Sequence, residues 1–274
     1  MLVWRKLASA KWEDAWVERL SFLGPTRLVI VSLPNRKSLR IEAYDLKKSE
    51  AEALVKQFGG QVKEIKEKAI AATPPRAPIA IRNKFWIADS QDAAAKLDDS
   101  RPCIVIPAAM AFGTGEHATT ASCLRLLCDL ADGFKGEKWD FLDLGTGSGI
   151  LAIAAKKLGA RKVEACDFDP HAVRTAKENV AMNQAEPLPV KKTDVLKWTP
   201  ARTWDVVAAN LFSQVLIAAS PAITAATKPG GWLVLSGILR VQEEEVVQAF
   251  TKCGFEIERS IHKGKWVSLL ARRG

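Results

Sequence analysis

The chain has 274 residues, 48% of them hydrophobic and 26% charged, which excludes a disordered chain and gives enough length for two domains. No apolar run approaches the roughly 18 residues of a membrane span, and acids and tryptophans appear too early for a signal peptide. We therefore expect a cytoplasmic protein without a membrane partner. Residues 1–88 hold 17 Lys and Arg against 9 Asp and Glu, whereas the remainder holds 23 against 22. This basic front part is either a contact surface for nucleic acid or an acidic partner, or only a solubilising face.

The cysteines and histidines do not form a recognisable ligand pattern. The five cysteines are scattered without a CxxC pair, and only three histidines are present. A disulfide framework or a zinc site would need closer, paired spacing, so we expect buried free thiols and no metal site.

The first seventy residues alternate between strand-like and helix-like patterns. The periodicity predicts strands at 2–9, 27–33, 38–44 and 61–68, and helices around 12–20 and over 46–58. This βαββαβ order is that of a small α+β ferredoxin-like domain, placed at residues 1–70, which RNA-binding domains also use. The strands lack the aromatic pattern that stacks bases, so we interpret the domain as a docking module of unspecified target. The helical spacing of Trp12 and Trp16 favours a position in the core.

A proline-rich segment at 71–78 predicts a stiff linker, and we assign residues 71–100 to it. Short apolar strands are expected at 85–87 and 103–106. The stretch PAAMAFGTGEHATTASCLRLL (107–127) then passes through a glycine loop into a helix that begins at Ala118.

Three polar side chains mark the start of that helix. Thr119 and Thr120 either cap it or, with its exposed amides, hold a carboxylate. His117, just before them, either has a direct chemical role or is only a surface residue.

The most informative stretch is FLDLGTGSGIL (141–151), a buried strand that leads into a glycine-rich turn and a helix. Its glycines, Gly145, Gly147 and Gly149, have GxGxG spacing, which differs from the GxGxxG of dinucleotide sites. Asp143 precedes them, where it would repel a pyrophosphate but accept a hydrogen bond from a cationic amino-acid ligand. The stretch therefore favours S-adenosylmethionine over NAD as the cofactor.

The rest of the chain repeats strand and helix, which predicts a parallel sheet covered on both faces with a ligand outside the carboxyl ends of its strands. Strands are expected at 162–167, 190–196, 204–210 and 231–238, a helix at 241–253, and a hairpin at 255–261 and 266–271. Asp167 ends its strand where an acid can bind both ribose hydroxyls, and Asp194 is a candidate for the adenine amino group. An antiparallel terminal hairpin is typical of a class I methyltransferase, a Rossmann-like seven-stranded domain that we place at residues 101–274.

Residues 107–274 resemble the PrmA-type ribosomal protein methyltransferases, which trimethylate amines of the large-subunit stalk-base protein. The segments that carry the resemblance are MAFGTGEHATT (110–120), FLDLGTGSGILAIAAKKLGA, CDFDP, VVAANLFSQVL, LVLSGIL and GKWVSLLA. The resemblance implies an S-adenosylmethionine-dependent N-methyltransferase that acts on lysine or N-terminal amines of a ribosomal protein, with the front domain selecting the substrate.

The same resemblance assigns roles at the cofactor site. Thr120 corresponds to a hydroxyl near the amino-acid end of the cofactor, Gly145 to the glycine-loop contact and Asp167 to the ribose acid. Asn210 corresponds to the residue that ends the fourth strand, and Phe112 and His117 line the loop. The predicted cofactor site consists of Phe112, Thr120, Asp143, Gly145, Gly147, Asp167 and Asn210. It does not include His117.

Methyl transfer needs a neutral amine aligned with an electrophilic methyl group. Desolvation beside a positive sulfonium would favour that neutral amine. Asn210 either accepts a hydrogen bond from the amine and aims its lone pair, as a catalytic residue, or only contacts the cofactor. Two other functions stay open: an RNA methyltransferase that holds RNA through its basic front domain, and a non-catalytic binding protein that keeps the cofactor fold.

Overall fold

The structure is a computed structural model, and it describes residues 1–12, 15–16, 19–23, 27–32, 37–65, 77–107, 115, 117–134 and 136–274. These residues separate into two compact units, 1–65 and 77–274, each with its own sheets and core. The expectations for the proline-rich segment before residue 77 and for Phe112 lie outside the described residues.

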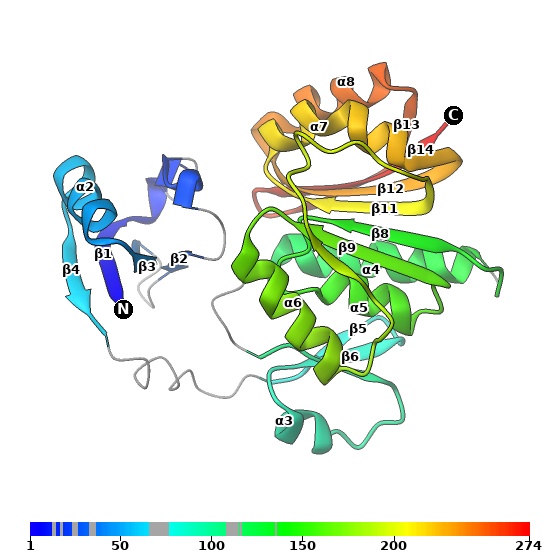
Figure 1. The fold of residues 1–274 in the computed structure, drawn as a ribbon, viewed down its shortest axis with the longest axis horizontal. Helices are drawn as coiled ribbons and strands as arrows, with labels where there is room; N and C mark the ends of the chain where they lie inside the picture. The colour runs from blue at the N-terminus through cyan, green and yellow to red at the C-terminus, as the bar shows by residue number, and fades with distance from the viewer. Residues whose placement is uncertain are drawn as a thin grey trace. The chain divides into compact units, whose positions relative to one another are not determined.

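The first unit is a four-stranded antiparallel sheet with helix α2 (Lys48–Phe58) packed on it (Figure 1). Its strands are β1 (Leu2–Ser9), β2 (Leu28–Ser32), β3 (Ser38–Leu46) and β4 (Gln61–Glu64), hydrogen-bonded in the order β2-β3-β1-β4. This strand order is that of the ferredoxin-like arrangement, so the predicted α+β fold of the front part is confirmed. Helix α2 begins at Lys48, two residues later than predicted, because β3 continues to Leu46.

The two front tryptophans differ in burial. Trp16 is 9% exposed and its ring packs edge-to-face against Phe58. Trp12 ends a short 3₁₀ turn (Ala10–Trp12) and is 56% exposed, so the expectation that it belongs to the core is wrong. Trp12 lies in this 3₁₀ turn whereas Trp16 is helical, so the two rings do not follow one helical period.

Residues 79–105 form a three-stranded sheet in the second unit, although the sequence assigns those up to 100 to the linker. The sheet consists of β5 (Ile79–Ile81), β6 (Phe85–Ala88) and β7 (Cys103–Val105), and a short helix α3 (Gln91–Ala95) lies between β6 and β7. The side chains of Ile81, Phe85 and Ile87 are buried in the core of the second unit. Burial of this apolar surface explains why the segment is ordered instead of forming a free linker.

The larger sheet of the second unit has seven strands in the order β10-β9-β8-β11-β12-β14-β13. They are β8 (Asp140–Leu144), β9 (Lys162–Asp167), β10 (Val190–Lys192), β11 (Trp204–Asn210), β12 (Thr227–Leu239), β13 (Phe255–Lys263) and β14 (Trp266–Arg273). All pairs are parallel up to β12, and the terminal hairpin pairs antiparallel through β14. The Rossmann-like class I methyltransferase architecture predicted from the sequence is confirmed.

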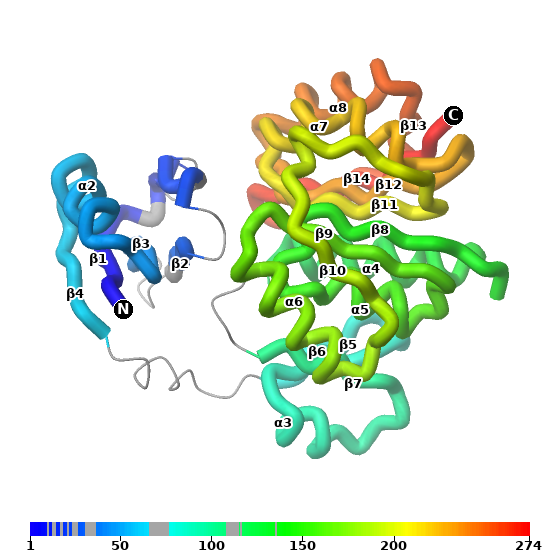
Figure 2. The backbone as a smooth tube through the Cα atoms, viewed as in Figure 1, coloured from blue at the N-terminus to red at the C-terminus, as the bar shows by residue number. Residues whose placement is uncertain are grey.

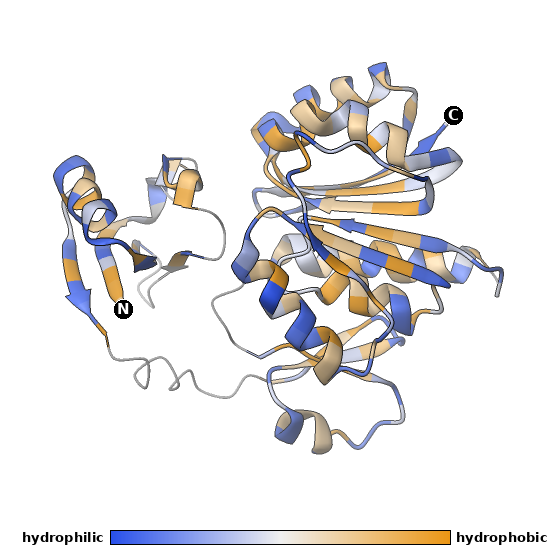
Figure 3. Ribbon diagram, viewed as in Figure 1, coloured by the Kyte–Doolittle hydropathy of each residue, from blue (hydrophilic) through white to orange (hydrophobic). Residues whose placement is uncertain are grey.

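Helices cover both faces of this sheet, as Figures 1 and 2 show. They are α4 (Ala118–Gly133), α5 (Ile150–Lys157), α6 (Pro170–Met182), α7 (Ser213–Ala226) and α8 (Glu243–Lys252). Alternate residues of a strand face opposite sides, so Phe141 packs in the core with α4 to α6, and Leu142 in the core with α7 and α8. The central strands β11 and β12 are accordingly mostly apolar along their length (Figure 3).

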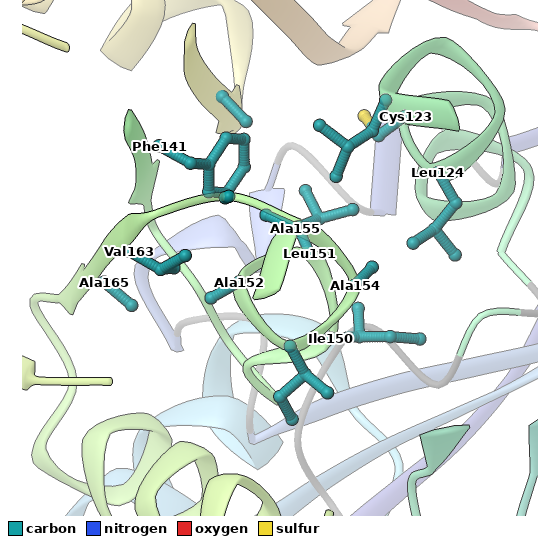
Figure 4. Packing of buried hydrophobic residues seen from close by; sticks show 14 of the residues in the cluster. Cys123, Leu124, Phe141, Ile150, Leu151, Ala152, Ala154, Ala155, Val163 and Ala165 are labelled. Carbon is teal, nitrogen blue, oxygen red and sulfur yellow. The ribbon is translucent and has the colours of Figure 1, made fainter. Parts of the chain in front are cut away.

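Helix α5 is buried on nearly every side. Six of its eight residues are buried. Figure 4 shows those that it labels (Ile150, Leu151, Ala152, Ala154 and Ala155) between Phe141 and Val163 on one side and Cys123 and Leu124 on the other. A helix that is apolar all round belongs in a core, which fixes the glycine turn at its start. Among the helices that the structure describes, none has the length and apolar character needed to cross a bilayer.

Candidate active site

Three neighbouring parallel strands end together at one edge of the seven-stranded sheet. Leu144 of β8 pairs with Cys166 of β9 on one side and with Ala209 of β11 on the other. The residues that follow these pairs, Gly145, Asp167 and Asn210, therefore share this edge, which we call the carboxyl edge. Ligands of open α/β sheets bind outside the carboxyl ends of the strands.

The glycine turn between β8 and α5 needs its glycines for backbone geometry. Gly145, Gly147 and Gly149 have φ values of +70°, +55° and +84°. A Cβ atom at Gly145 would lie 2.2 Å from the Cδ2 atom of Leu211. A side chain is thus disfavoured at this position both by φ and by the close approach of Leu211.

Asp167 joins the glycine turn to the end of β9. Its Oδ2 accepts a hydrogen bond from the Gly147 amide at 2.9 Å, and its Oδ1 accepts one from the Asp169 amide at 3.0 Å. Burial raises the pKa of the Asp167 carboxyl. The carboxylate predicted to bind ribose is therefore held in a fixed orientation beside the turn.

The buried carboxyl group of Asp143 has one hydrogen-bonded oxygen and one oxygen without a protein partner. Its Oδ2 accepts a hydrogen bond from the Thr146 hydroxyl at 2.5 Å, and its Oδ1 has no protein partner. Burial raises the pKa of Asp143 to about 7, and the neighbouring charge of Asp167 adds to the increase. A bound cation would favour the charged carboxylate here, because an opposite charge lowers the pKa of an acid.

The threonines at the start of α4 do not cap the helix. The N-cap residue is His117, whose side chain makes no capping hydrogen bond. The Oγ1 atom of Thr119 lies 2.7 Å from His117 Nδ1 and accepts a hydrogen bond from Asn210 Nδ2 at 3.3 Å. Thr120 is 1% exposed, and its Oγ1 has no protein partner.

Buried oxygen atoms without a protein partner lie at the carboxyl edge and on the elements beside it. Among the described residues, four buried side-chain oxygens lack a protein partner: Thr120 Oγ1, Asp143 Oδ1, Asn210 Oδ1 and Ser213 Oγ. A buried polar atom without a partner costs about 1–3 kcal/mol, so such atoms seldom persist without a ligand. Carboxylate, amide and hydroxyl oxygens together suit a ligand with ammonium and hydroxyl donors.

The structure adds residues that the sequence analysis did not assign. A Cβ atom at Gly237 would lie 2.4 Å from the backbone oxygen of Leu211, the residue that follows Asn210. Gly237 and Gly145 both leave space for Leu211 because they have no side chain. The available signal was a glycine inside an apolar strand pattern. Thr119 was noted only as one of two equivalent threonines.

Asp194 lies two residues beyond the end of β10, whose observed length is three residues. Its Oδ1 accepts a hydrogen bond from the Leu196 amide at 3.1 Å.

Within the described part of the chain, no group of three or more His, Cys, Asp and Glu side chains could hold a metal ion.

Comparison with known proteins relates the chain to one family. A family model described as ribosomal protein L11 methyltransferase (PrmA) matches residues 23–274. A protein of that name from Chloroflexus aurantiacus is 45% identical over 195 residues, which are 62% of this chain and 58% of that protein. Another, from Listeria monocytogenes, is 35% identical over 198 residues, which are 72% of this chain and 62% of that protein.

The solved structure of a ribosomal protein L11 methylase from Lactobacillus delbrueckii subsp. bulgaricus is also similar. It has a TM-score of 0.63 and 28% sequence identity, over 73% of this chain and 100% of that one. The chain spans 52–58% of the length of three of the curated relatives that it matches.

Proposed function

We propose that this chain, which belongs to the ribosomal protein L11 methyltransferase (PrmA) family, is an S-adenosylmethionine-dependent N-methyltransferase. Its substrate is ribosomal protein L11 at the stalk base of the large subunit, and it modifies a lysine, the N-terminal amine or both. The observation that carries the proposal is the set of four unpartnered buried oxygens at and beside the carboxyl edge. Because its substrate is ribosomal, we expect the protein in the cytoplasm.

The residues of this edge fit the cofactor. The free Oδ1 of Asp143 can accept a hydrogen bond from the ammonium group, and the Thr120 hydroxyl can bond at the amino-acid end. Gly145 and Gly147 keep side chains out of the turn, and Asp167 can bind the ribose hydroxyls. Phe112 is included in this proposed site by the resemblance of the segment MAFGTGEHATT (110–120).

The sulfonium, when bound, supplies a methyl group to the lone pair of the amine, and the electrons of the broken C–S bond remain on sulfur. The task of the protein is to bind, orient and exclude water. The amine must first lose a proton, which passes to water. Asn210 Oδ1, which is buried and has no protein partner, can then accept a hydrogen bond from the remaining N–H and aim the lone pair.

Two alternative functions make different demands. An RNA methyltransferase would use the basic front part, which carries a net charge of +8 over residues 1–88, to bind phosphates. A non-catalytic binding protein would bind the cofactor without turnover. The substrate protein stays our leading proposal, with at most a weak RNA contact through the front unit.

One experiment separates the three. Radiolabelled S-adenosylmethionine is incubated with the full chain and either purified L11 or purified ribosomal RNA, and cofactor binding is measured by calorimetry. We expect label in L11. Label in RNA, together with RNA binding that weakens steeply with salt, would support the second function. Binding without transfer would support the third, and absence of binding would overturn all three.

A further inference from the structure

A chain of hydrogen bonds connects Asn210 to the half-buried imidazole of His117. Asn210 Nδ2 donates to Thr119 Oγ1 at 3.3 Å, and Thr119 Oγ1 lies 2.7 Å from His117 Nδ1. Thr119 is 1% exposed, so its hydroxyl has little access to water as a substitute partner. The chain of contacts joins the start of α4 to the end of β11.

The protons of this chain are coupled. A hydroxyl has one proton, which it can donate to only one acceptor at a time. If His117 Nδ1 is unprotonated, the Thr119 proton goes to that nitrogen, and the Thr119 oxygen is left to accept from Asn210 Nδ2. If Nδ1 carries a proton, the Thr119 hydroxyl can donate its proton to Asn210 instead. The Asn210 amide is then rotated by 180°, so that its Oδ1 faces the hydroxyl and accepts. An unprotonated Nδ1 therefore fixes the Asn210 amide with Nδ2 toward Thr119, because it takes the only proton of the hydroxyl.

The surroundings of His117 favour the neutral ring. Burial, and after it the charge of Lys265, lowers the pKa of His117 to about 4. The ring also packs edge-to-face against Trp266, with a centroid distance of 5.1 Å. A neutral imidazole has one acceptor nitrogen, and we assign that role to Nδ1, which lies 2.7 Å from the Thr119 hydroxyl oxygen.

We propose that Thr119 is a positioning residue whose hydroxyl, fixed by His117, holds the Asn210 amide with its Oδ1 directed at the substrate amine. This inference rests on the proposed methyltransferase function. Oδ1 can accept a hydrogen bond from an amine N–H. The Nδ2 group of the amide can only donate, so it would place its own N–H groups against those of the amine. The adjacent Thr120 has a different part, since its unpartnered hydroxyl belongs to the proposed cofactor contact.

Variants at position 119 test the proposal through separate kinetic parameters. Thr119→Val keeps the shape of the side chain but removes the hydroxyl, so we expect kcat for L11 methylation to fall at least about tenfold. The dissociation constant of S-adenosylmethionine should stay within about threefold, because cofactor contacts are untouched. Thr119→Ser restores the hydroxyl and should keep kcat within about threefold of the unmodified protein.

Two further variants serve as comparisons. Thr224→Val removes a threonine hydroxyl that bonds only within α7, to the Ser220 carbonyl at 2.7 Å, and should leave kcat unchanged. Thr120→Val should instead weaken cofactor binding. Equal losses of kcat and cofactor affinity in Thr119→Val would overturn the proposal, as would full activity in that variant.

A second measurement does not depend on the substrate. Nitrogen-15 NMR of the imidazole rings, assigned with His171→Gln and His262→Gln variants, reports which nitrogen of His117 carries the proton. We expect an unprotonated Nδ1 and a neutral ring down to about pH 5, in line with the lowered pKa. A protonated Nδ1 at neutral pH would overturn the proposal. If the tautomer is as expected but no L11 is methylated, the proposed function fails while the hydrogen-bond arrangement stands.

Discussion

Asp143 is the buried carboxyl at the centre of the proposed cofactor site. It is 1% exposed, and its carboxyl has a pKa of about 7 in the folded protein against an ordinary value of 3.8. The folded state binds this proton more tightly than the unfolded chain does. The free energy of unfolding therefore falls as the pH rises from about 4 to about 7, and the loss is complete above pH 7.

We expect Asp143→Asn to stabilise the cofactor-free protein at pH 8 by about 1–3 kcal/mol, because it removes a buried charge and keeps an acceptor for the Thr146 hydroxyl. Near pH 4 the difference should disappear. Urea unfolding at both pH values measures it, with the exposed Asp98→Asn as the control. The variant should also lose its calorimetric response to S-adenosylmethionine. Equal stability of the variant and the unmodified protein at pH 8 would show that Asp143 is not a destabilising charge.

Asn210 is the residue that we expect to contact the reacting amine. Asn210→Ala should lower kcat for L11 methylation by about 10- to 100-fold, because the amine is no longer oriented. Initial rates with labelled cofactor measure the effect. The control is Asn83→Ala, a change of the same kind at an exposed position outside the site. Activity within about twofold of the unmodified protein would remove Asn210 from the site.

At the scale of secondary-structure elements, the segment that follows Asn210 is confined by two glycines. The Leu211 amide donates a hydrogen bond to the Ser236 carbonyl at 3.1 Å. The Leu211 carbonyl oxygen would lie only 2.4 Å from a Cβ atom at Gly237. Its side chain occupies the corresponding space beside Gly145. The position of Asn210 at the carboxyl edge thus depends on close packing of backbone between β11, β12 and the glycine turn.

Gly237→Ala should destabilise the protein by at least about 2 kcal/mol more than Gly254→Ala. Both residues have positive φ, +81° and +87°, so the conformational cost is similar. Only at Gly237 does the added Cβ meet the backbone, whereas nothing lies within 4 Å of a Cβ at Gly254. Urea unfolding of the two variants compares them directly. Equal effects would mean that the Leu211 segment moves aside at little cost.

At the scale of the whole molecule, the proposed chemistry lies in one of the two units. The proposed cofactor site lies within residues 77–274, which have their own buried core. The positive charge lies mainly in the front part, where Glu42 is buried and forms ion pairs with Arg5 and Arg40. Under our proposal, cofactor binding belongs to residues 77–274 and substrate selection to the front unit.

Residues 77–274 expressed alone should bind S-adenosylmethionine with a dissociation constant within about threefold of that of the full chain. Methylation of L11 should fall at least about tenfold, because the docking contacts of the front unit are lost. Calorimetry measures the first quantity and transfer of labelled methyl groups the second. If the fragment methylates L11 as fast as the full chain, the front unit has no part in substrate selection.

The sequence by itself determined the elements whose signals are local. The boundaries of β9 and β11 were predicted to the residue, and each strand ends in a polar side chain that directly follows apolar residues. The GxGxG spacing after Asp143 predicted the turn, since positive φ at each of those glycines is a property of the backbone itself. The terminal hairpin followed from two apolar strands separated by a short polar turn.

Only the tertiary structure decided the features that depend on distant neighbours. Thr119 and Thr120 are indistinguishable in the sequence, yet only Thr119 contacts Asn210, which lies 91 positions away. Trp12 is exposed because it lies in a 3₁₀ turn, and β5, which the sequence did not predict, has its Ile81 side chain buried in the core of the second unit. The raised pKa of Asp143 likewise comes from burial, which is a property of packing and not of spacing along the chain.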